Sequence, residues 1–208
     1  LAALDLKDPA NSKTMRRLVQ QADIVMDNLR PGVVERLGLG YEAVKQINPA
    51  IISASTPAWG TEGPMQNVPG MDAQVQMFSG FASLNGKQGD RPELLRFQAQ
   101  LDLNASCFFV CSILLGLIQR ERTGMGQNVI SAHLASAITL LITRIAENLA
   151  TGVAPGPIGD ASASSAPHQY FYCEDGRYLA VGVESDEQWK RFCIALSREE
   201  WLDDPRFE

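Results

Sequence analysis

The segment Asp23-Ile24-Val25-Met26-Asp27 has the composition of a short buried strand, and Ala50-Ile51-Ile52-Ser53-Ala54-Ser55 has the same character. Between them, Pro31 suits the first turn of a brief helix, and the residues from Tyr41 to Ile47 predict a second one. Strands that alternate with helices indicate βαβ units. The sequence therefore predicts the α/β class, with a parallel sheet and flanking helices.

Ligands of parallel α/β sheets bind beyond the carboxyl ends of the strands. This rule places the loops Asn28–Gly32 and Ser55–Pro64 at the rim of a binding crevice. Arg30 and Arg36 flank the first loop. Taken alone, each is more typical of a solvated surface charge, but a guanidinium at a sheet rim is also the side chain expected to bind phosphate groups.

An apolar segment, Leu103–Ile118, follows Asp102. It is apolar on all sides, which predicts a buried helix. Asp102 is the only acid between Leu94 and Thr123 apart from Glu121. Its position at the start of the helix favours a role as N-cap. The alternative is a carboxylate held at a cleft as a nucleophile or base.

Composition narrows the function classes. The chain has 208 residues, 45% of them hydrophobic and 20% charged, which is ordinary for a globular protein with a core. A net charge of −6 without any basic run argues against nucleic-acid binding, so a polyanionic ligand would need local cations. The longest apolar run contains Asn104, Ser106 and Ser112 and is short for a membrane span, so no membrane association is expected.

The cysteines match no zinc or redox spacing. Cys107 and Cys111 lie on the apolar helix, where small buried thiols are expected, and a reducing cytoplasm fits such a protein. No signal peptide is visible. Leu1 has no methionine before it, and Glu208 ends the chain without any terminal character, so we expect a piece of a longer protein.

Caps and periodicity predict the remaining helices. Asn11 or Ser12 suits the N-cap of the first one, Gly124 is expected to end the Asp102 helix, and residues 132–150 predict another. We expect a large domain over residues 1–150, a linker rich in small residues over 151–167, and the start of a small α+β domain over 168–208. A β-hairpin is predicted around Glu174-Asp175-Gly176.

Histidine chemistry is limited to two residues. His133 lies early in an apolar helix and is expected to be structural, while His168 ends the linker and has a small chance of contacting a ligand. A Ser-His-Asp triad lacks its Gly-x-Ser-x-Gly elbow, no phosphate-binding glycine loop occurs, and no metal site is expected.

A set of short motifs runs through the chain in a characteristic order. They are Leu4-Asp5-Leu6-Lys7, Ala22-Asp23-Ile24-Val25, Asn28-Leu29-Arg30-Pro31-Gly32, Arg36-Leu37-Gly38-Leu39-Gly40-Tyr41, Asn48-Pro49, Trp59-Gly60-Thr61-Glu62-Gly63-Pro64, Gly70-Met71-Asp72, Gln76, Ser79-Gly80, Arg120-Glu121-Arg122-Thr123-Gly124-Met125-Gly126-Gln127 and Asp175-Gly176. Together they resemble the family III CoA-transferases, a group that contains formyl-CoA transferase, carnitine-CoA transferase and, as a close relative, α-methylacyl-CoA racemase.

The resemblance implies a Rossmann-like large domain and transfer of CoA between carboxylic acids. It places the family's catalytic aspartate on Asp102, which reverses the preference for a cap. Acyl-CoA and a small carboxylic acid are the implied substrates, with no tightly bound cofactor, and the family forms interlocked homodimers. Residues implied at the CoA cleft are Arg36, for the nucleotide end, and more weakly Arg30, with Asn28, Gly32, Trp59 and Met71.

Two departures from the family pattern affect the expected chemistry. Racemases carry a histidine where this chain has Met71, which cannot transfer a proton. The glycine-rich loop of the formyl-type transferases is reduced to scattered glycines within residues 151–167. An acyl-CoA racemase or isomerase and a non-catalytic CoA-binding fragment are the alternatives to the transferase.

Overall fold

The structure is a computed structural model that describes residues 3–207. The chain forms two compact units. One runs as far as Ala82 and resumes from Leu94 to Pro155, and the other comprises Ser83–Glu93 and the chain from Gly156 onward. The second unit therefore takes in a short segment from the middle of the sequence, and its main part begins inside the expected linker of residues 151–167.

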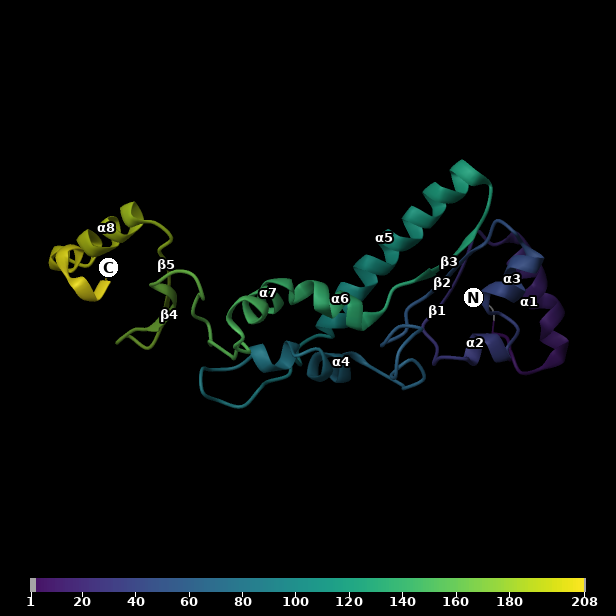
Figure 1. The fold of residues 1–208 in the computed structure, drawn as a ribbon, viewed down its shortest axis with the longest axis horizontal. Coiled ribbons are helices and arrows are strands. Elements are labelled where there is room, and N and C mark those ends of the chain that lie inside the picture. The colour runs from purple at the N-terminus through teal and green to yellow at the C-terminus, as the bar shows by residue number, and fades with distance from the viewer. Residues whose placement is uncertain (1–2, 208) are drawn as a thin grey trace. The chain divides into compact units, whose positions relative to one another are not determined.

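The first unit contains a three-stranded parallel sheet of β1 (Ile24–Asp27), β2 (Ile52–Ser55) and β3 (Gln127–Ile130), in that order. In Figure 1, α5 (Gln100–Thr123) runs along this sheet, while α1 (Pro9–Gln21) and α3 (Tyr41–Ile47) lie beyond its other side. The predicted α/β class, parallel pairing and flanking helices are confirmed.

Two adjacent isoleucines divide the core between the faces of the sheet, because successive strand side chains point in opposite directions. Ile51 is fully buried with Val19 of α1 and Val44 of α3. Ile52 is fully buried on the other face with Phe109 of α5 and Val129 of β3. The continuous apolar character of this segment thus reflects helices on both faces.

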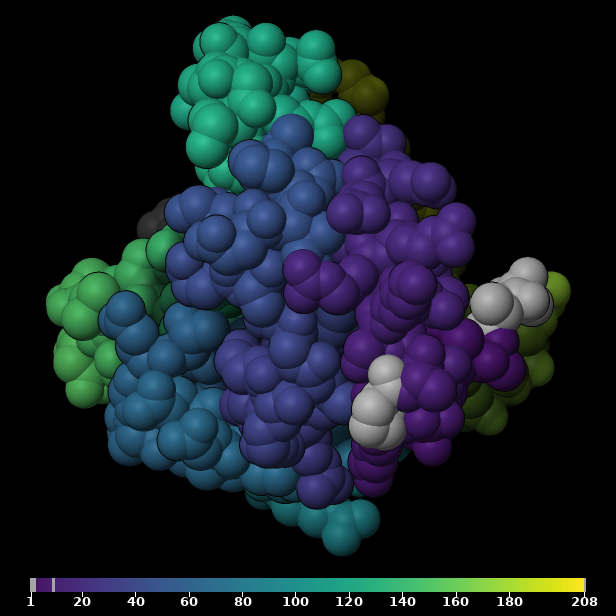
Figure 2. All heavy atoms as spheres, turned by 90° about the vertical axis from the view of Figure 1, so that its right-hand side faces the viewer, coloured from purple at the N-terminus to yellow at the C-terminus, as the bar shows by residue number. Residues whose placement is uncertain are grey.

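The N-terminal helix begins earlier than expected. Asp8, and not Asn11 or Ser12, is the N-cap of α1, and its carboxylate accepts a hydrogen bond from the Ala10 N–H at 2.9 Å. Pro9 occupies the first helical position, where its fixed φ suits the helix. At the other end, the Asn48 amide donates to the carbonyls of Val19 and Ala22. The purple surface of α1 and the blue surface of α3 adjoin in Figure 2.

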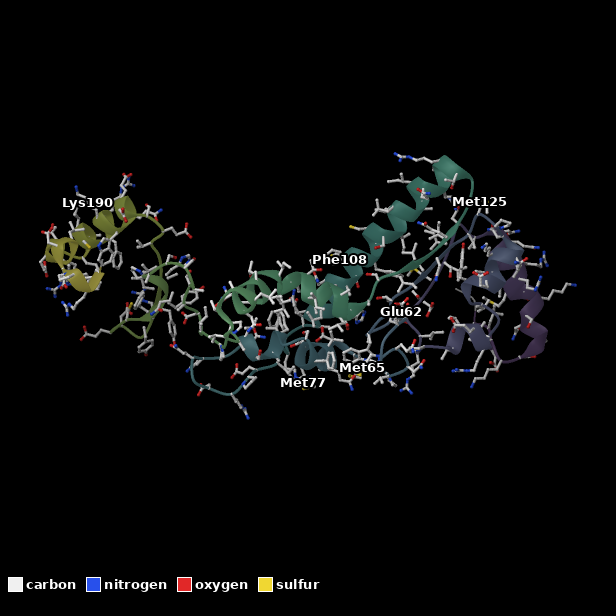
Figure 3. All side chains as sticks on the ribbon, viewed as in Figure 1. Glu62, Met65, Met77, Phe108, Met125 and Lys190 are labelled. Carbon is white, nitrogen blue, oxygen red and sulfur yellow. The ribbon has the colours of Figure 1, made fainter. Side chains whose placement is uncertain are left out.

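Helix α5 is less covered than its composition predicts. Its buried positions lie along one stripe, which faces α4 and α6 at Leu101 and the sheet at Phe109 and Ile113: Leu101, Ala105, Phe109, Ile113 and Gly116. Leu115 is 66% exposed, and Phe108, labelled in Figure 3, is 40% exposed. Cys107 and Cys111 are also exposed, so the expectation of buried thiols was wrong. By length and composition alone, α5 is the one helix among residues 3–207 that could cross a membrane.

Two glycines fix the return from α5 into β3. Gly124 ends α5 in the left-handed region at φ 71°, as predicted, and its N–H donates to the Arg120 carbonyl at 2.7 Å. Gly126 lies against the backbone that enters β2, and a Cβ there would be 2.0 Å from the Ile51 carbonyl oxygen. Its own N–H donates to the Pro49 carbonyl at 2.9 Å.

Shorter elements complete the first unit. They are α2 (Val33–Arg36), α4 (Asp72–Phe78), α6 (His133–Leu140) and α7 (Ile142–Thr151). The helix predicted over residues 132–150 is therefore interrupted at Leu141, and its second part ends at Gly152 with φ 71°.

The second unit contains the predicted hairpin, formed by β4 (His168–Tyr172) and β5 (Tyr178–Gly182). It is followed by α8 (Asp186–Ala195), and three 3-10 helices also belong to this unit wholly or in part: η1 (Phe81–Leu84), η2 (Glu199–Asp203) and η3 (Pro205–Phe207). Trp189 of α8 stacks on Trp201 with ring centroids 6.3 Å apart. Aromatic contacts thus pack α8 against η2 and η3.

Candidate functional site

Asp102 lies inside the first turn of α5 and does not cap it. The helix begins at Gln100, and the N-cap position is Ala99, which has no capping side chain. The capping role falls to Asp72, whose Oδ2 accepts hydrogen bonds from the N–H groups of Leu101 at 2.7 Å and Asp102 at 3.2 Å. The carboxylate of Asp102 is therefore not engaged as the cap of its own helix.

The position of Asp72 is determined by its neighbours. Gln76, one turn along α4, donates through its side-chain amide to Asp72 Oδ1. The same amide group pairs with the Leu95 backbone, accepting from its N–H at 2.9 Å and donating to its carbonyl at 3.1 Å. At Gly70, a Cβ would lie 2.4 Å from the Ala58 Cβ and 2.8 Å from Trp59 Nε1. Close packing therefore explains the glycine, and helix capping explains the aspartate, of the Gly70-Met71-Asp72 motif.

His133 is the site residue that the sequence analysis missed. It begins α6, directly after the carboxyl end of β3, and its backbone N–H donates to the Pro57 carbonyl at 3.2 Å. Its Nδ1 lies 3.3 Å from Asp102 Oδ1. Within residues 3–207, Nδ1 is buried and has no hydrogen bond of standard geometry, so this off-angle contact with the Asp102 carboxylate is its main polar interaction. The strand-end rule applied to β3 would have identified it.

Burial raises the pKa of the Asp102 carboxyl above its ordinary value. Two neighbouring side chains act on it more weakly and in opposite directions: His133 lowers the pKa of the Asp102 carboxyl and Asp72 raises it. A less solvated carboxylate with a raised pKa is a stronger nucleophile than a free one. The side chain of Asp102 keeps 46% of its surface exposed, so a substrate can reach it.

Removing the charge of Asp72 should change the pKa of Asp102 in a defined direction. Asp72→Asn keeps an oxygen acceptor for the Leu101 and Asp102 N–H groups but removes a negative neighbour, so the pKa of Asp102 should fall. Carboxyl-carbon NMR titration measures this shift. Asp72→Ala also removes the acceptor and should lower the free energy of unfolding by about 1–3 kcal/mol. An unchanged Asp102 titration in Asp72→Asn would contradict the electrostatic coupling.

Trp59 and Met71 flank the Asp72 cap. Trp59 packs on the buried cluster of Val75, Leu101 and Ala137, and its ring meets Phe78 edge-on at 5.1 Å. Within the described residues, its Nε1 is buried without a hydrogen-bond partner. Met71, by contrast, is 65% exposed. Trp59 thus packs against the start of α5 through Leu101, whereas the Met71 side chain is exposed to solvent beside Asp72.

The other predicted residues gather after β1, at the opposite edge of the sheet from β3. Asn28, Arg30 and Arg36 are exposed. Gly32 precedes α2 with φ 76°, and a Cβ there would lie 3.0 Å from the Arg36 guanidinium. Gly32 and Arg36 are therefore brought together, and β2 lies between this group and the Asp102–His133 pair.

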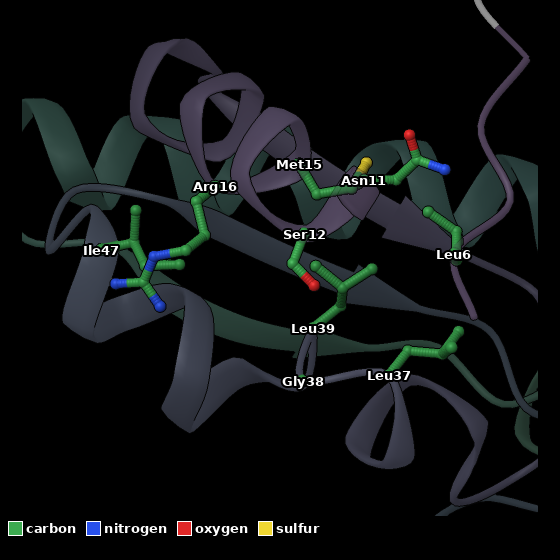
Figure 4. Close-up of a pocket in the computed structure, with 9 residues that line it drawn as sticks. All are labelled: Leu6, Asn11, Ser12, Met15, Arg16, Leu37, Gly38, Leu39 and Ile47. Atoms are coloured by element: carbon green, nitrogen blue, oxygen red, sulfur yellow. The ribbon is translucent and has the colours of Figure 1, made fainter. Parts of the chain in front are cut away.

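Two adjoining hollows lie between α1 and the segment around α2. The first, drawn in Figure 4, is lined by Ser12, Leu39 and other residues, and its Arg16 side chain extends toward Ile47. The second is lined by Lys7 and Arg36, and the two hollows share Leu6, Ser12 and Leu37. Cationic side chains thus line a concave surface of a protein whose net charge is −6.

His168 in the second unit has neighbours that superficially resemble a triad. Ser165 Oγ is 3.1 Å from His168 Nδ1, and Glu184 Oε1 is 3.6 Å from the same nitrogen. A catalytic triad needs the hydroxyl and the carboxylate on opposite ring nitrogens. This arrangement therefore cannot relay a proton from serine to glutamate.

Comparison with known proteins gives consistent results. A family model described as CoA-transferase family III matches residues 1–208. The chain is 32% identical over 204 residues to acetyl-CoA:oxalate CoA-transferase of Acetobacter aceti, covering 98% of this chain and 52% of that protein. It is 34% identical over 209 residues to succinyl-CoA:glutarate CoA-transferase of Mus musculus, covering 99% and 47%.

Solved structures also match. A CAIB/BAIF family protein from Brucella suis aligns with a TM-score of 0.84 at 31% identity, covering 98% of this chain and 53% of that one. The chain therefore spans about half the length of the relatives that it matches.

Proposed function

Because the chain belongs to CoA-transferase family III, we propose that the intact protein transfers CoA from an acyl-CoA thioester to a carboxylic acid, with Asp102 as nucleophile. The observation that carries this proposal is the state of the Asp102 carboxylate. It is accessible, its pKa is raised by burial, and the N–H groups at the start of its helix are bonded to Asp72 instead. A carboxylate in that state is suited to covalent catalysis.

The chemistry proceeds through covalent intermediates on Asp102. One carboxylate oxygen attacks the thioester carbonyl, the C–S bond breaks, and CoA leaves as a thiolate from an acyl-aspartyl anhydride. The thiolate then attacks the Asp102 Cγ, which releases the donor acid and leaves an aspartyl-CoA thioester. The acceptor carboxylate attacks the same Cγ, the C–S bond breaks, and CoA leaves as a thiolate from an acceptor-aspartyl anhydride. The thiolate then attacks the carbonyl carbon of the acceptor, which forms the product thioester and releases the Asp102 carboxylate. Every charge is carried by a carboxylate or a thiolate, so no net proton transfer is needed.

The nucleotide end of CoA is assigned to the concave surface near α2. Arg36 and Lys7 line one hollow, and Arg16 lines the adjoining one. Guanidinium and ammonium groups bind phosphate oxygens through charge-assisted hydrogen bonds. Asn28, Arg30 and Gly32 lie in the loop between β1 and α2, next to this surface, and would contact the nucleotide half of CoA. Trp59 and Met71 lie near Asp102 and would contact the thioester half.

Loss of Arg36 should weaken donor binding more than catalysis. Arg36→Ala is expected to raise the KM for acyl-CoA by about 10- to 100-fold with a small change in kcat, because one charge-assisted phosphate contact is worth about 1.5–3 kcal/mol. Steady-state kinetics measures both constants. Arg17→Ala, an exposed arginine on α1 outside both hollows, is the matched control.

A truncated donor identifies the end of CoA that Arg36 binds. An acyl-pantetheine thioester lacks the nucleotide phosphates, so its kcat/KM should be the same in Arg36→Ala and in the unmodified protein. An equal loss with both donors would contradict a phosphate contact and assign Arg36 a structural role.

Racemase chemistry is disfavoured by the geometry around Asp102. Two acid/base groups must face opposite sides of one α-carbon, yet His133 contacts Asp102 at 3.3 Å and leaves no room for a carbon between them. Met71 cannot serve as the second base. Exchange of the substrate's α-hydrogen with solvent deuterium, in the absence of any acceptor acid, would instead support the racemase.

The decisive test traps the covalent intermediate. The intact protein is incubated with acetyl-CoA or succinyl-CoA and then with hydroxylamine, and peptides are analysed by mass spectrometry. Oxalate and glutarate are the first acceptors to supply, because relatives are named for them. A hydroxamate on Asp102 supports the transferase. CoA binding without any adduct or product would favour a non-catalytic CoA-binding protein.

A further inference from the structure

We infer that His133 is the oxyanion donor for the steps in which Asp102 is itself attacked. This inference rests on the proposed function of Asp102 and assigns a role to a residue that contacts its reacting carboxyl group. The two side chains come from different helices: Asp102 from the first turn of α5 and His133 from the first residue of α6.

The environment of His133 determines which ring nitrogen carries its proton. Nδ1 is buried and lies 3.3 Å from Asp102 Oδ1. A bare Nδ1 lone pair facing a carboxylate oxygen would be repelled, so the proton belongs on Nδ1. The N–H then lies beside Oδ1, off the line of a hydrogen bond, and leaves the other carboxylate oxygen as the nucleophile. The off-angle contact fits a hydrogen bond that tightens once the carboxyl group reacts.

Charge develops on Oδ1 in two of the transfer steps. When CoA thiolate attacks Cγ of the anhydride, and when the acceptor carboxylate attacks Cγ of the aspartyl thioester, the carbonyl electron pair moves onto this oxygen. The Nδ1–H donates to the oxyanion in each tetrahedral state, which then collapses and expels the leaving group. The proton stays on the ring throughout. In the first step, by contrast, the oxyanion forms on the donor's acyl oxygen, beyond the reach of the Oδ1 contact.

The other groups that face Asp102 do not replace this donor. Asp72 of α4 is itself an acceptor, and it occupies the backbone N–H groups of Leu101 and Asp102. Asn104, the next polar side chain on α5, donates to the Ser136 carbonyl at 3.0 Å. His133 therefore supplies a side-chain N–H that contacts the Asp102 carboxyl group in the described structure.

Three substitutions at position 133 separate this role from packing. Asn places an amide N–H where Nδ1 stood, Gln places one where Nε2 stood, and Leu has none. His133→Leu and His133→Gln should lower kcat by about 100- to 1,000-fold, the usual loss for one oxyanion donor. His133→Asn should retain kcat within about 10-fold. Since Asn and Gln are both polar amides, their comparison holds even if the Leu variant does not fold.

Single-turnover measurements locate the affected step. Intact protein is mixed with acyl-CoA and quenched at intervals, and acyl-Asp102 and CoA-Asp102 are measured by mass spectrometry. The slow variants should form the acyl adduct at nearly the normal rate and accumulate it. Adducts that turn over equally fast in the Gln and Asn variants would overturn the role of His133 alone. Absence of any Asp102 adduct in the unsubstituted protein would overturn the proposed function and the inference together.

Discussion

Asp102→Asn is expected to lower the rate of CoA transfer in the intact protein by about 10⁴-fold or more, as the loss of a covalent nucleophile does elsewhere. The amide has the shape of the carboxyl group but cannot attack a thioester. Initial rates at saturating donor and acceptor measure the loss. Mass spectrometry should also show no acyl or CoA adduct on residue 102.

Asp27→Asn is the matched control. Asp27 also ends a strand, and burial raises the pKa of its carboxyl group as well, but its side chain accepts a hydrogen bond from the Leu29 N–H at 3.0 Å. Activity should therefore remain within a few-fold in this variant. Full activity in Asp102→Asn and in Asp102→Ala would eliminate the carboxylate as the nucleophile.

Gly126→Ala should cause the largest loss of stability, about 3–5 kcal/mol in the free energy of unfolding. The added Cβ would meet the Ile51 carbonyl oxygen at 2.0 Å and the Ala50 carbonyl carbon at 2.6 Å. Both are backbone atoms at the entrance to β2, so no side chain can rotate away to relieve the contact. Urea denaturation followed by circular dichroism measures the change.

Gly124→Ala, two residues earlier, separates steric contact from backbone strain. Nothing lies within 4 Å of a Cβ at Gly124, but its φ of 71° is unfavourable for alanine. A loss of about 1 kcal/mol is expected there. Equal losses in the two variants would show that close approach of the strands is not what requires glycine at position 126.

The first two strands of the sheet and their parallel pairing were predictable because their determinants are local. The segments around Val25 and Ile52 are short and apolar, the helical pattern lies between them, and Gly124 marks the end of α5 by a rule of backbone conformation. Each of these signals spans only a few residues. The resemblance to the family, in turn, rested on motifs whose order survives in the chain although each motif is weak alone.

The contacts around Asp102 could not be predicted in the same way. Asp72 reaches its partners across 29 and 30 residues of sequence, and His133 lies on a different helix. No periodicity links such positions, so Ala99 could not be recognised as an uncapped helix start. The burial of α5 was also mispredicted. An apolar composition on all sides of a helix does not show which face the sheet will cover and which will stay exposed.

The two carboxylates at the start of α5 have become unequal. Asp72 lies at the start of α5, where the helix dipole stabilises a negative charge. It accepts the N–H groups of Leu101 and Asp102, so these donors are not available to the Asp102 carboxylate. The Asp102 carboxylate is therefore fixed on the helix but is not stabilised by the N–H groups of Leu101 or Asp102. Because one carboxylate caps the helix, the other stays free to react. A capping residue far away in sequence thus helps to determine the reactivity of Asp102.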